Sequence, residues 1–403
     1  MQYDVVIVGA GPAGATAAKF LSEKGIRTLL LDKAVFPREK SCGGGLPIRV
    51  LKRFKYLEEN NLIDSYSYGM HVYSTTLEHH IEILKNEPLI AMVLRKSFDQ
   101  GLVNLATRAG AELRCGNAVQ HVQIEADKAQ LLLEDGCRVD SQVVIGADGI
   151  WSTTAKTIGV QHDCTNIGVC VYKEYPMKQE TLDRLYSKQR FAYIHLQPHG
   201  LAGYGWVFPK KEHVNIGVVE FRQAIDPSKE KKNLKENFKG YLGILKDQKL
   251  VQKNLSAQEA RGGAFPTYAV DTLATDRVML CGDAGGLVNP ADGEGMYFAM
   301  CSGEIAANVA VKALENNTTD ASTLGLYQKQ WKKEFQKNLS LFYLLSKRWR
   351  GNIENTVKLI SKDPHLVDVV YAALTNEGGV QKEKWRIARR FAISYCKDRL
   401  GLP

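Results

Sequence analysis

Two glycine-rich segments carry the residues with the clearest chemistry in this chain of 403 residues. The first, Gly9 to Gly14, has the spacing GxGxxG and follows the apolar run from Tyr3 to Val8. In this pattern one glycine permits a tight turn, one lets backbone approach a pyrophosphate, and one lets the next helix pack closely. That helix, expected over 13–24, would present its N–H groups and positive dipole end to phosphates. The segment therefore predicts a dinucleotide site.

A carboxylate completes this first pattern. A second strand, expected over 27–31, leads directly to Asp32, which lies about 20 residues past the glycines, where an acid can hold a ribose hydroxyl. The pattern alone does not distinguish NAD from FAD. The residues expected to contact the dinucleotide are Gly9, Gly11, Pro12, Ala13, Gly14, Asp32 and Lys33.

The second glycine-rich segment runs from Gly282 to Gly286 and continues to Gly295. It follows a strand expected over 277–281 and precedes a helix expected over 295–315. In this order, the two segments together indicate that the dinucleotide is FAD.

Two further positions are candidates for the same cofactor. Asp148 lies in a Gly-Ala-Asp-Gly turn after an expected buried strand over 143–145, and the alternative to a cofactor contact is a plain Asp-Gly turn. Arg95 begins a helix expected over 95–110. It is either a solvated helix-start residue or a cation that reaches the phosphates.

Composition limits the class of protein. The chain is 44% apolar and 24% charged, which is ordinary for a globular protein. No apolar run is long enough to cross a membrane, and no signal peptide precedes the strand at Tyr3, so we expect a cytoplasmic protein. The net charge of +9 suits nucleic acid, anionic lipid or an acidic redox partner. No nucleic-acid motif is present, so no nucleic-acid partner and no metal site are expected.

The helices and strands expected around these residues indicate a fold of the α/β class with mixed α+β character. We expect a Rossmann-type FAD-binding domain interleaved with an antiparallel-sheet substrate domain, and a helical C-terminus. The expected FAD-binding domain comprises residues 1–70, 92–164 and 262–320, the substrate domain 71–91 and 165–261, and the helical region 321–403. Other expected elements are a helix over 48–60, strands within 71–87, a hairpin over 119–139 that turns at 134–136, and a lysine-rich helix near 228–247.

The order of these motifs resembles that of the FAD-dependent oxidoreductases of the para-hydroxybenzoate hydroxylase-like class, over roughly the first 310 residues. The resemblance implies that Asp283 binds the ribityl and diphosphate region of FAD. It also implies that Asn289 to Met296 lies along the isoalloxazine ring, where a helix N-terminus would stabilise a reduced, anionic flavin. The cofactor contacts that it adds are Arg95, Asp148, Gly282, Asp283, Pro290, Gly293, Gly295 and Met296.

Two motifs narrow the family. Lys40 to Gly45 reads KSCGGG, and Tyr204 to Lys210 reads YGWVFPK. Both resemble geranylgeranyl reductases, flavoproteins that saturate isoprenoid double bonds. The resemblance implies an FAD-dependent reductase that saturates carbon–carbon double bonds of a geranylgeranyl or polyprenyl chain in a membrane lipid, chlorophyll or quinone precursor, by flavin hydride transfer plus protonation. The alternatives are an FAD-dependent monooxygenase or halogenase of the same fold acting on an apolar substrate, and a non-catalytic flavoprotein.

The second motif also reads as a plain strand that ends at its proline. In the functional interpretation its rings line an apolar tunnel for the prenyl chain. The residues expected to bind the substrate are Tyr204, Trp206, Phe208 and Pro209.

Cys42 is the candidate proton donor. An isoprene double bond is unactivated, so hydride addition must be coupled to protonation of the other carbon. The thiol could supply that proton or only fill space, and water or the reduced flavin could serve instead. The glycines after it suggest close approach to the flavin, so Cys42, Gly43 and Gly44 are expected cofactor contacts. Five histidines of the middle region are expected to be surface or packing residues: His71, His79, His80, His195 and His199.

Two basic segments, 327–350 and 381–400, combine Lys and Arg with aromatic residues. They are either solvated helices packed on the core or a surface that contacts the membrane as a peripheral protein on its inner face. Trp385, Ala388, Phe391 and Tyr395 would form the apolar stripe. The expected partners are a prenyl lipid or prenyl diphosphate substrate, and NADPH or ferredoxin as electron donor.

Overall fold

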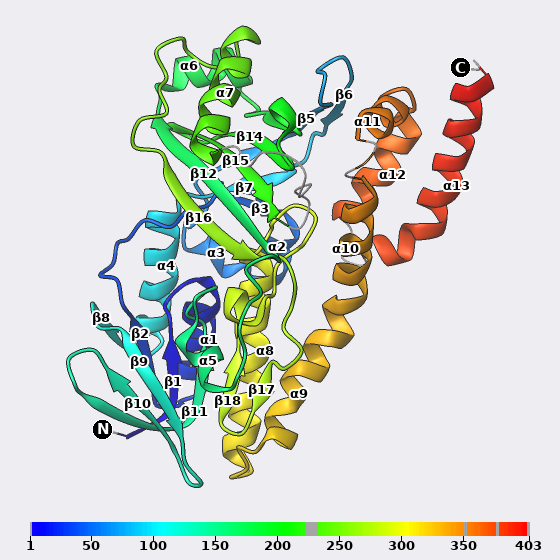
Figure 1. The fold of residues 1–403 in the computed structure, drawn as a ribbon. Helices are drawn as coiled ribbons and strands as arrows, with labels where there is room; N and C mark the ends of the chain where they lie inside the picture. The colour runs from blue at the N-terminus through cyan, green and yellow to red at the C-terminus, as the bar shows by residue number, and fades with distance from the viewer. Residues whose placement is uncertain (1, 223–232, 350, 352, 376–378, 401–403) are drawn as a thin grey trace. The chain divides into compact units, whose positions relative to one another are not determined.

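The computed structural model describes residues 2–222, 233–349, 351, 353–375 and 379–400. The chain divides into two compact units, each assembled from three stretches of sequence (Figure 1). The first unit comprises residues 1–40, 95–167 and 265–339, and the second comprises residues 41–94, 168–264 and 340–403.

The first unit is built on a largely parallel sheet. Strand β1 (Gln2–Val8) lies at its centre, in parallel with β2 (Thr28–Asp32) on one side and β11 (Arg138–Gly146) on the other. Val5, Val6 and Ile7 are fully buried, as expected for a strand covered on both faces. The full order is β17-β18-β11-β1-β2-β8, with β17 at Ala274–Thr275, β18 at Val278–Leu280 and β8 at Glu112–Cys115. The expected Rossmann-type fold is confirmed.

Helices pack beside this sheet. Helix α1 (Pro12–Ser22) contacts both α8 (Met296–Glu315) and α4 (Arg95–Arg108). The contact with α8 is close, because a Cβ on Gly303 would lie 2.2 Å from the Ala13 carbonyl oxygen. The unit also contains α5 (Thr153–Thr157), α9 (Ala321–Trp331) and a π-helical turn over Lys332–Gln336.

A seven-stranded sheet forms the second unit, in the order β16-β12-β15-β14-β13-β5-β6. Its four central strands, β12 to β15, pair antiparallel, whereas β13 and β5 run parallel. The bounds are Arg261–Pro266 (β16), Ile167–Pro176 (β12), His213–Phe221 (β15), Gly203–Pro209 (β14), Ala192–Leu196 (β13), Gly69–Tyr73 (β5) and His80–Leu84 (β6). A smaller sheet joins β3 (Gly45–Pro47), β7 (Ile90–Met92) and β4 (Ser65–Ser67).

One face of the seven-stranded sheet is covered by two helices, α6 (Gln179–Tyr186) and α7 (Leu234–Asp247). Val207, Ile216, Phe238 and Tyr241 belong to the core between them. Because side chains alternate along a strand, the neighbours of Val207 in β14 point to the opposite face. The sheet therefore has one face buried by helices and one face that carries the tyrosine, tryptophan and phenylalanine of the YGWVFPK motif.

Four helices end the chain: α10 (Lys337–Trp349), α11 (Ile353–Ser361), α12 (Pro364–Thr375) and α13 (Gly379–Leu400). Helices α11 and α12 share an apolar cluster with strand β6 that includes Ile81, Ile83, Val357, Ile360 and Leu366. Among the residues that the structure describes, no helix has the length and apolar character needed to cross a bilayer.

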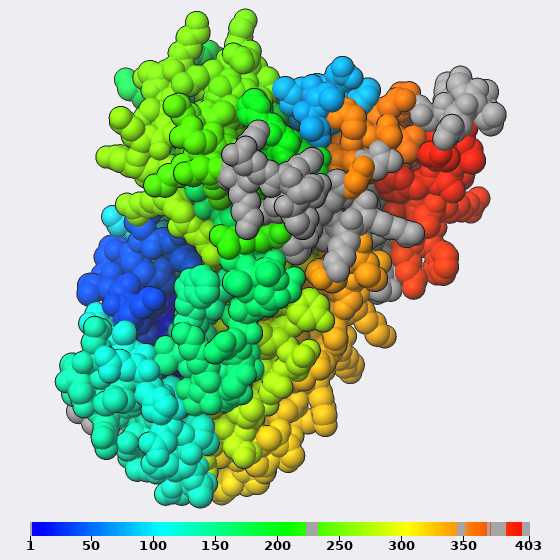
Figure 2. All heavy atoms as spheres, viewed as in Figure 1, coloured from blue at the N-terminus to red at the C-terminus, as the bar shows by residue number. Residues whose placement is uncertain are grey.

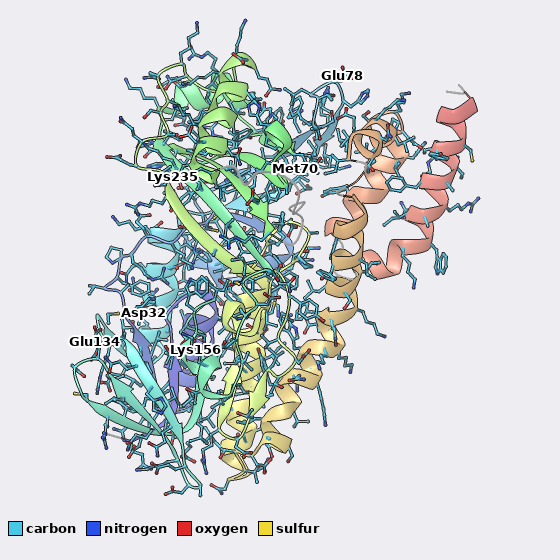
Figure 3. The ribbon with its side chains drawn as sticks, viewed as in Figure 1. Asp32, Met70, Glu78, Glu134, Lys156 and Lys235 are labelled. Atoms are coloured by element: carbon cyan, nitrogen blue, oxygen red, sulfur yellow. The ribbon has the colours of Figure 1, made fainter. Side chains whose placement is uncertain are left out.

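Several local expectations differ from the structure. The expected hairpin over 119–139 is a three-stranded arrangement of β9 (Val119–Ile124), β10 (Ala129–Leu133) and β11, so the chain turns at 125–128 as well as at 134–136. Figure 3 labels Glu134 at the second of these turns. The helix expected over 48–60 is divided at Phe54 into α2 (Arg49–Arg53) and α3 (Tyr56–Glu59).

Helix α6 was not expected from the sequence at all. The lysine-rich helix begins at Leu234, where the Asn233 side chain accepts a hydrogen bond from the Lys235 backbone and so caps the N-terminus. Residues 228–232 of that expectation lie outside the described residues.

The unit boundaries also differ from the expected domains. Residues 41–70 fall in the second unit, because β3 and β4 both pair with β7 there. Residues 340–403 cluster with the same unit, and 321–339 cluster with the first.

Candidate functional site

The GxGxxG turn in the first unit has the conformation that its glycines require. Gly9 has φ +99°, and a Cβ there would lie 2.3 Å from the Ala147 carbonyl oxygen. A Cβ on Gly14 would lie 1.9 Å from the Gly9 carbonyl oxygen, so only glycine lets α1 pack this closely. A Cβ on Gly11 would meet a single non-neighbouring atom within 4 Å, the Arg38 Nη2 at 3.7 Å. The turn is thus crowded at two glycines and open at the one where a pyrophosphate is expected to approach.

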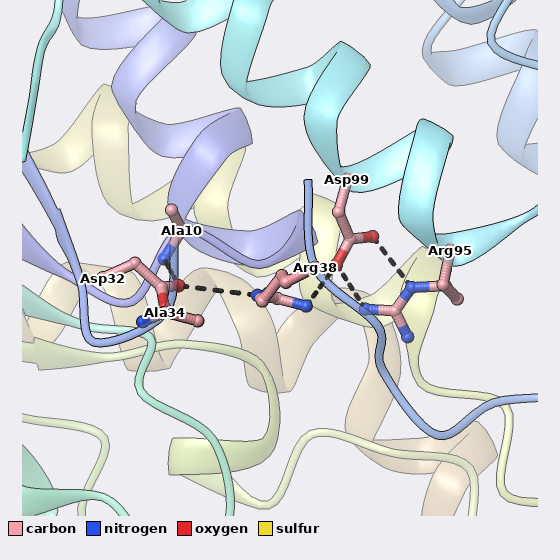
Figure 4. Close-up of polar contacts among 6 residues, drawn as sticks. All are labelled: Ala10, Asp32, Ala34, Arg38, Arg95 and Asp99. Atoms are coloured by element: carbon pink, nitrogen blue, oxygen red, sulfur yellow. Dashed lines mark hydrogen bonds and ion pairs between the residues drawn. The ribbon is translucent and has the colours of Figure 1, made fainter. Parts of the chain in front are cut away.

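Asp32 ends strand β2 with a buried carboxylate. Its Oδ2 accepts a hydrogen bond from the Ala10 N–H at 2.8 Å, and its Oδ1 accepts one from the Ala34 N–H at 2.8 Å (Figure 4). Each carboxylate oxygen has a second lone pair, so this arrangement can also accept hydrogen bonds from ribose hydroxyls. Lys33, which was expected beside it, is exposed.

Two arginines meet at a third carboxylate, Asp99, which is fully buried in α4. Arg38 donates to it from Nη1 at 3.0 Å, and Arg95 donates from Nε and Nη2, both at 2.8 Å (Figure 4). Two guanidinium groups share this one carboxylate, and Arg38 also lies 3.9 Å from Asp32. The arginine beside Gly11 is therefore Arg38, which sequence reasoning missed because it lies in a loop without a motif.

The second glycine-rich segment forms a short 3₁₀ turn over Gly282–Gly285. The Gly282 N–H donates to the Ser302 hydroxyl at 3.0 Å, and Asp283 remains half-buried. Gly293 has φ +76°, and Gly295 directly precedes α8. Pro290 and Met296 are buried. The segment therefore ends where a helix N-terminus begins, which suits an anionic flavin edge.

A histidine that the sequence reasoning did not single out lies on this turn. His162 Nε2 is 3.1 Å from the Ala284 carbonyl oxygen. Burial lowers the pKa of His162, and the neighbouring Asp283 charge opposes that shift. A neutral histidine here can donate its ring N–H to the turn and hold it in place.

Asp148 is engaged by the helix that follows it. Its carboxylate accepts hydrogen bonds from the Ser152 hydroxyl at 2.5 Å, the Thr153 N–H at 2.8 Å and the Thr154 N–H at 3.1 Å. Burial raises the pKa of Asp148, while these hydrogen bonds act to lower it. The side chain thus stabilises the N-terminus of α5 together with the N-cap residue Ser152, which accounts for an aspartate at this position without a cofactor contact.

The Cys42 loop, which we define as residues 41–45, belongs to the second unit. The Ser41 hydroxyl donates to the Gly262 carbonyl at 2.6 Å. The Cys42 carbonyl accepts from the Asn215 side chain at 3.1 Å, and the Cys42 sulfur accepts from the Gly44 N–H at 3.3 Å. The loop is therefore tied to strands β15 and β16, and its thiol is half-buried.

The structure gives a reason for each glycine of this loop. A Cβ on Gly43 would lie 2.9 Å from the Phe208 ring, and one on Gly45 would lie 3.2 Å from the same ring. Gly44 has φ +78°, and a Cβ there would lie 2.2 Å from the Val93 carbonyl oxygen. Packing and backbone conformation require glycine at position 44, and Gly43 and Gly45 lie close against the Phe208 ring. The approach of these glycines to the flavin stays a prediction.

The aromatic residues of strand β14 lie on one face, as their alternation predicts. The ring centroids of Tyr204 and Trp206 are 6.1 Å apart, and those of Trp206 and Phe208 are 6.4 Å apart. Trp206 is buried over Gly217 of β15, where a Cβ would lie 2.2 Å from the indole. Tyr204 and Phe208 stay half-buried, and Pro209 is buried at the strand end.

The middle-region histidines fit the surface or packing roles expected of them. His195 is fully buried between the Tyr241 hydroxyl at 2.9 Å and the Gln248 Oε1 at 2.8 Å. Burial lowers the pKa of His195 to about 4, so the ring is neutral near pH 7. His71 stacks on Tyr193 with ring centroids 5.0 Å apart.

The first unit fits FAD on its own geometry. It offers an open glycine turn, a helix N-terminus, a buried carboxylate with spare lone pairs and a guanidinium group beside the turn. A family model described as an FAD binding domain matches residues 2–333. Digeranylgeranylglycerophospholipid reductase 1 of Methanopyrus kandleri is 32% identical over 344 residues, which cover 83% of this chain and 88% of that protein.

The chain belongs to the geranylgeranyl reductase family. It is an FAD-dependent oxidoreductase of that family, and its cofactor is FAD. A geranylgeranyl bacteriochlorophyll reductase-like protein from Thermoplasma acidophilum has the same fold, with a TM-score of 0.79, 23% identity and 98% coverage of both chains. A flavin-dependent brominase also shares the fold, with a TM-score of 0.75, 21% identity and coverage of 99% of this chain and 100% of that one.

Proposed function

We propose that this geranylgeranyl reductase family member saturates carbon–carbon double bonds of a geranylgeranyl or longer polyprenyl chain. The observation that carries the proposal is the packing of the Cys42 loop on the aromatic strand β14, which puts a thiol and an aromatic surface in one unit. The name of the Methanopyrus kandleri relative supports a lipid-bound prenyl substrate, and a free prenyl diphosphate is the second substrate class.

Bound FAD, once reduced by NADPH or ferredoxin, would supply the hydride for one alkene carbon. Cys42 delivers a proton to the other carbon: its S–H bond breaks, a C–H bond forms, and the thiolate regains a proton from water. The alkene therefore gains two hydrogens and becomes an alkane. General acid catalysis of this kind contributes about 100-fold to 10,000-fold in rate.

The aromatic residues of strand β14 have different proposed roles. Tyr204 and Phe208 keep part of their rings accessible, and we assign them to contact with the apolar prenyl chain. Trp206 is 5% exposed, so its role is to support the loop and the neighbouring rings. Pro209 ends the strand.

The C-terminal helix α13 supplies an outward surface that we assign to peripheral membrane contact. Trp385 is 78% exposed and Tyr395 is 50% exposed, with Arg386 and Arg389 exposed near them; Figure 2 shows the red atoms of this helix at the surface. Exposed aromatic and cationic side chains suit an anionic lipid interface. Phe391 departs from the expected stripe, because it packs against the apolar cluster of α11 and α12. The side chains of Trp349 and Arg350 lie outside the described residues.

One anaerobic experiment tests the proposed function. The FAD-loaded protein is reduced with dithionite and mixed with geranylgeranyl lipids and, separately, geranylgeranyl diphosphate. We expect reoxidation of the flavin and a mass gain of about 2 Da for each bond saturated. A reduced flavin that stays reduced with both substrates would overturn the proposal. Product oxygenation that needs air and NAD(P)H would favour the monooxygenase alternative. The physiological donor, NADPH or ferredoxin, follows from which of the two reduces the flavin.

A further inference from the structure

A cluster of three polar side chains lies beside the Cys42 loop; two of them are buried and the third, Glu174, is half-buried. We call Glu174, Lys210 and Asn215 the Lys210 cluster. Asn215 of β15 lies directly opposite Glu174 of β12 on one side and Phe208 of β14 on the other. Lys210 directly follows β14 and is 1% exposed, and Asn215 is fully buried.

The lysine of this cluster is paired. Lys210 Nζ donates to the Glu174 carboxylate at 3.0 Å. A buried ammonium group is costly unless it is paired, and apolar residues of similar size often replace such pairs without loss of stability. Stability alone therefore does not explain a lysine here. Its nearest feature in the loop is Gly44, where a Cβ would lie 2.8 Å from Lys210 Nζ.

The asparagine has only one workable orientation. The indole N–H of Trp206 can only donate, and it donates to Asn215 Oδ1 at 2.7 Å. The amide nitrogen must then donate, and it does so twice: to Glu174 at 2.7 Å and to the Cys42 carbonyl at 3.1 Å. Glu174 thus connects the ion pair to the amide that holds Cys42.

These contacts hold one residue at two points. Asn215 fixes the Cys42 carbonyl, and the Gly44 N–H fixes the Cys42 sulfur as an acceptor. The hydrogen of the thiol is then left to be donated elsewhere. We infer that Asn215 is a positioning residue for Cys42, and that the Lys210–Glu174 ion pair fixes the Asn215 amide. This inference rests on the proposed function, in which Cys42 delivers the proton.

The test uses the full-length, FAD-loaded protein and the variant Asn215→Leu, which keeps the side-chain size and removes the hydrogen bonds. Iodoacetamide alkylation of Cys42 is followed by peptide mass spectrometry, with the exposed Cys164 as reference in the same molecule. We expect Cys42 to react at least about fivefold faster, since losing one hydrogen bond corresponds to roughly that factor. Prenyl turnover should fall about tenfold or more with KM and flavin content unchanged.

Two controls separate positioning from general stability. Lys173→Met removes the adjacent lysine on β12, whose ion pair with Glu259 is at the surface, and should change neither readout. The double variant Glu174→Gln/Lys210→Met keeps an acceptor for Asn215 and removes both charges of the ion pair. It should lie between the wild type and Asn215→Leu in both readouts, because the amide keeps an acceptor but loses the ion pair that fixes it. Trp206→Phe, which removes the indole N–H donor together with part of the buried ring, repeats the test if Asn215→Leu does not fold.

Unchanged Cys42 reactivity in Asn215→Leu, or in Trp206→Phe where that variant stands in, would overturn the inference. The inference would also be overturned if Asn215→Leu and the double variant lost turnover equally, each in proportion to its folded fraction. The proposed function is judged separately with Cys42→Ala. If that variant keeps full turnover while Asn215→Leu still alters Cys42 reactivity, the positioning stands and the proton role of Cys42 fails.

Discussion

Arg38 and Arg95 donate hydrogen bonds to the same buried carboxylate, Asp99, although they come from a loop and from the start of α4. Arg38 also lies 3.9 Å from Asp32, and its guanidinium is the nearest group to the open side of Gly11. Because Arg95 is bound to Asp99 through two of its nitrogens, we assign Arg38 to the FAD diphosphate and Arg95 to holding Asp99.

Arg38→Met should therefore weaken FAD binding. A hydrogen bond to a charged group contributes about 1.5 to 3 kcal/mol, so we expect the Kd for FAD to rise about tenfold to 100-fold. Fluorescence titration of the apoprotein with FAD measures the change. Arg108→Met is the matched control, because Arg108 is exposed in the last turn of α4. Equal Kd values for Arg38→Met and the wild type would assign the diphosphate contact elsewhere.

Stability at acid pH should depend on His195. Its pKa is lowered by burial to about 4 in the folded protein, against an ordinary value of 6.5. The unfolded chain therefore binds the proton more tightly. The stabilisation from the neutral ring is fully present above pH 6.5 and is lost as the pH falls from 6.5 to about 4. It amounts to about 3 kcal/mol at most.

Urea unfolding at pH 7, 5.5 and 4.5 tests this expectation. We expect His195→Gln to be less stable than the wild type at pH 7. Between pH 7 and pH 4.5, however, its free energy of unfolding should decrease by less than that of the wild type. His199→Gln serves as the control, since His199 is exposed. If the pH dependence is the same in His195→Gln as in the wild type, His195 does not titrate in this range.

Substitutions of Trp206 and Phe208 should affect different properties, the first mainly stability and the second mainly KM for the substrate. Trp206 is buried, so Trp206→Ala should lower the free energy of unfolding by about 3 to 5 kcal/mol and weaken prenyl turnover. Phe208→Leu keeps apolar volume against Gly43 and should mainly raise KM for the prenyl substrate. The flavin spectrum should stay near that of the wild type in both variants. Full turnover of every prenyl substrate by both variants would make the motif purely structural.

Much of the first unit could be predicted from the sequence, because the GxGxxG and GDAGG segments allow only a few backbone conformations. The structure confirms the strand, turn and helix around Gly9 to Gly14 and the strand that leads to Gly282. Arg38 escaped prediction because its partner, Asp99, is far away in the chain. Such long-range pairing leaves no local pattern.

The second unit was harder to predict from the sequence, because it also depends on contacts between residues far apart in the chain. The alternation of Tyr204, Trp206 and Phe208 predicted a shared strand face, and the structure has it. The sequence does not show that Asn215 and Glu174 lie beside that strand, since the register between strands is a tertiary property. The glycines after Cys42 pointed to a close approach, and the close partners in this unit are Phe208 and the Val93 carbonyl.

Two substitutions of Cys42 test its proposed role as the proton donor. Cys42→Ser keeps a smaller donor that is a much weaker acid, and Cys42→Ala removes the donor. If the thiol delivers the proton, both variants should bind FAD and accept electrons at the wild-type rate, and both should stall at substrate reduction.

Single-turnover oxidation of the pre-reduced enzyme by a geranylgeranyl lipid measures that step directly. We expect a loss of about 100-fold or more, with alanine the more severe. The exposed Cys164→Ala variant controls for thiol chemistry elsewhere. A loss under about threefold in both Cys42 variants would make the thiol a packing residue and move the proton to water or the flavin. A loss of FAD binding instead would give the Cys42 loop a role in supporting the cofactor. The loop would then depend on its hydrogen bonds with Asn215 and Gly262 for its shape.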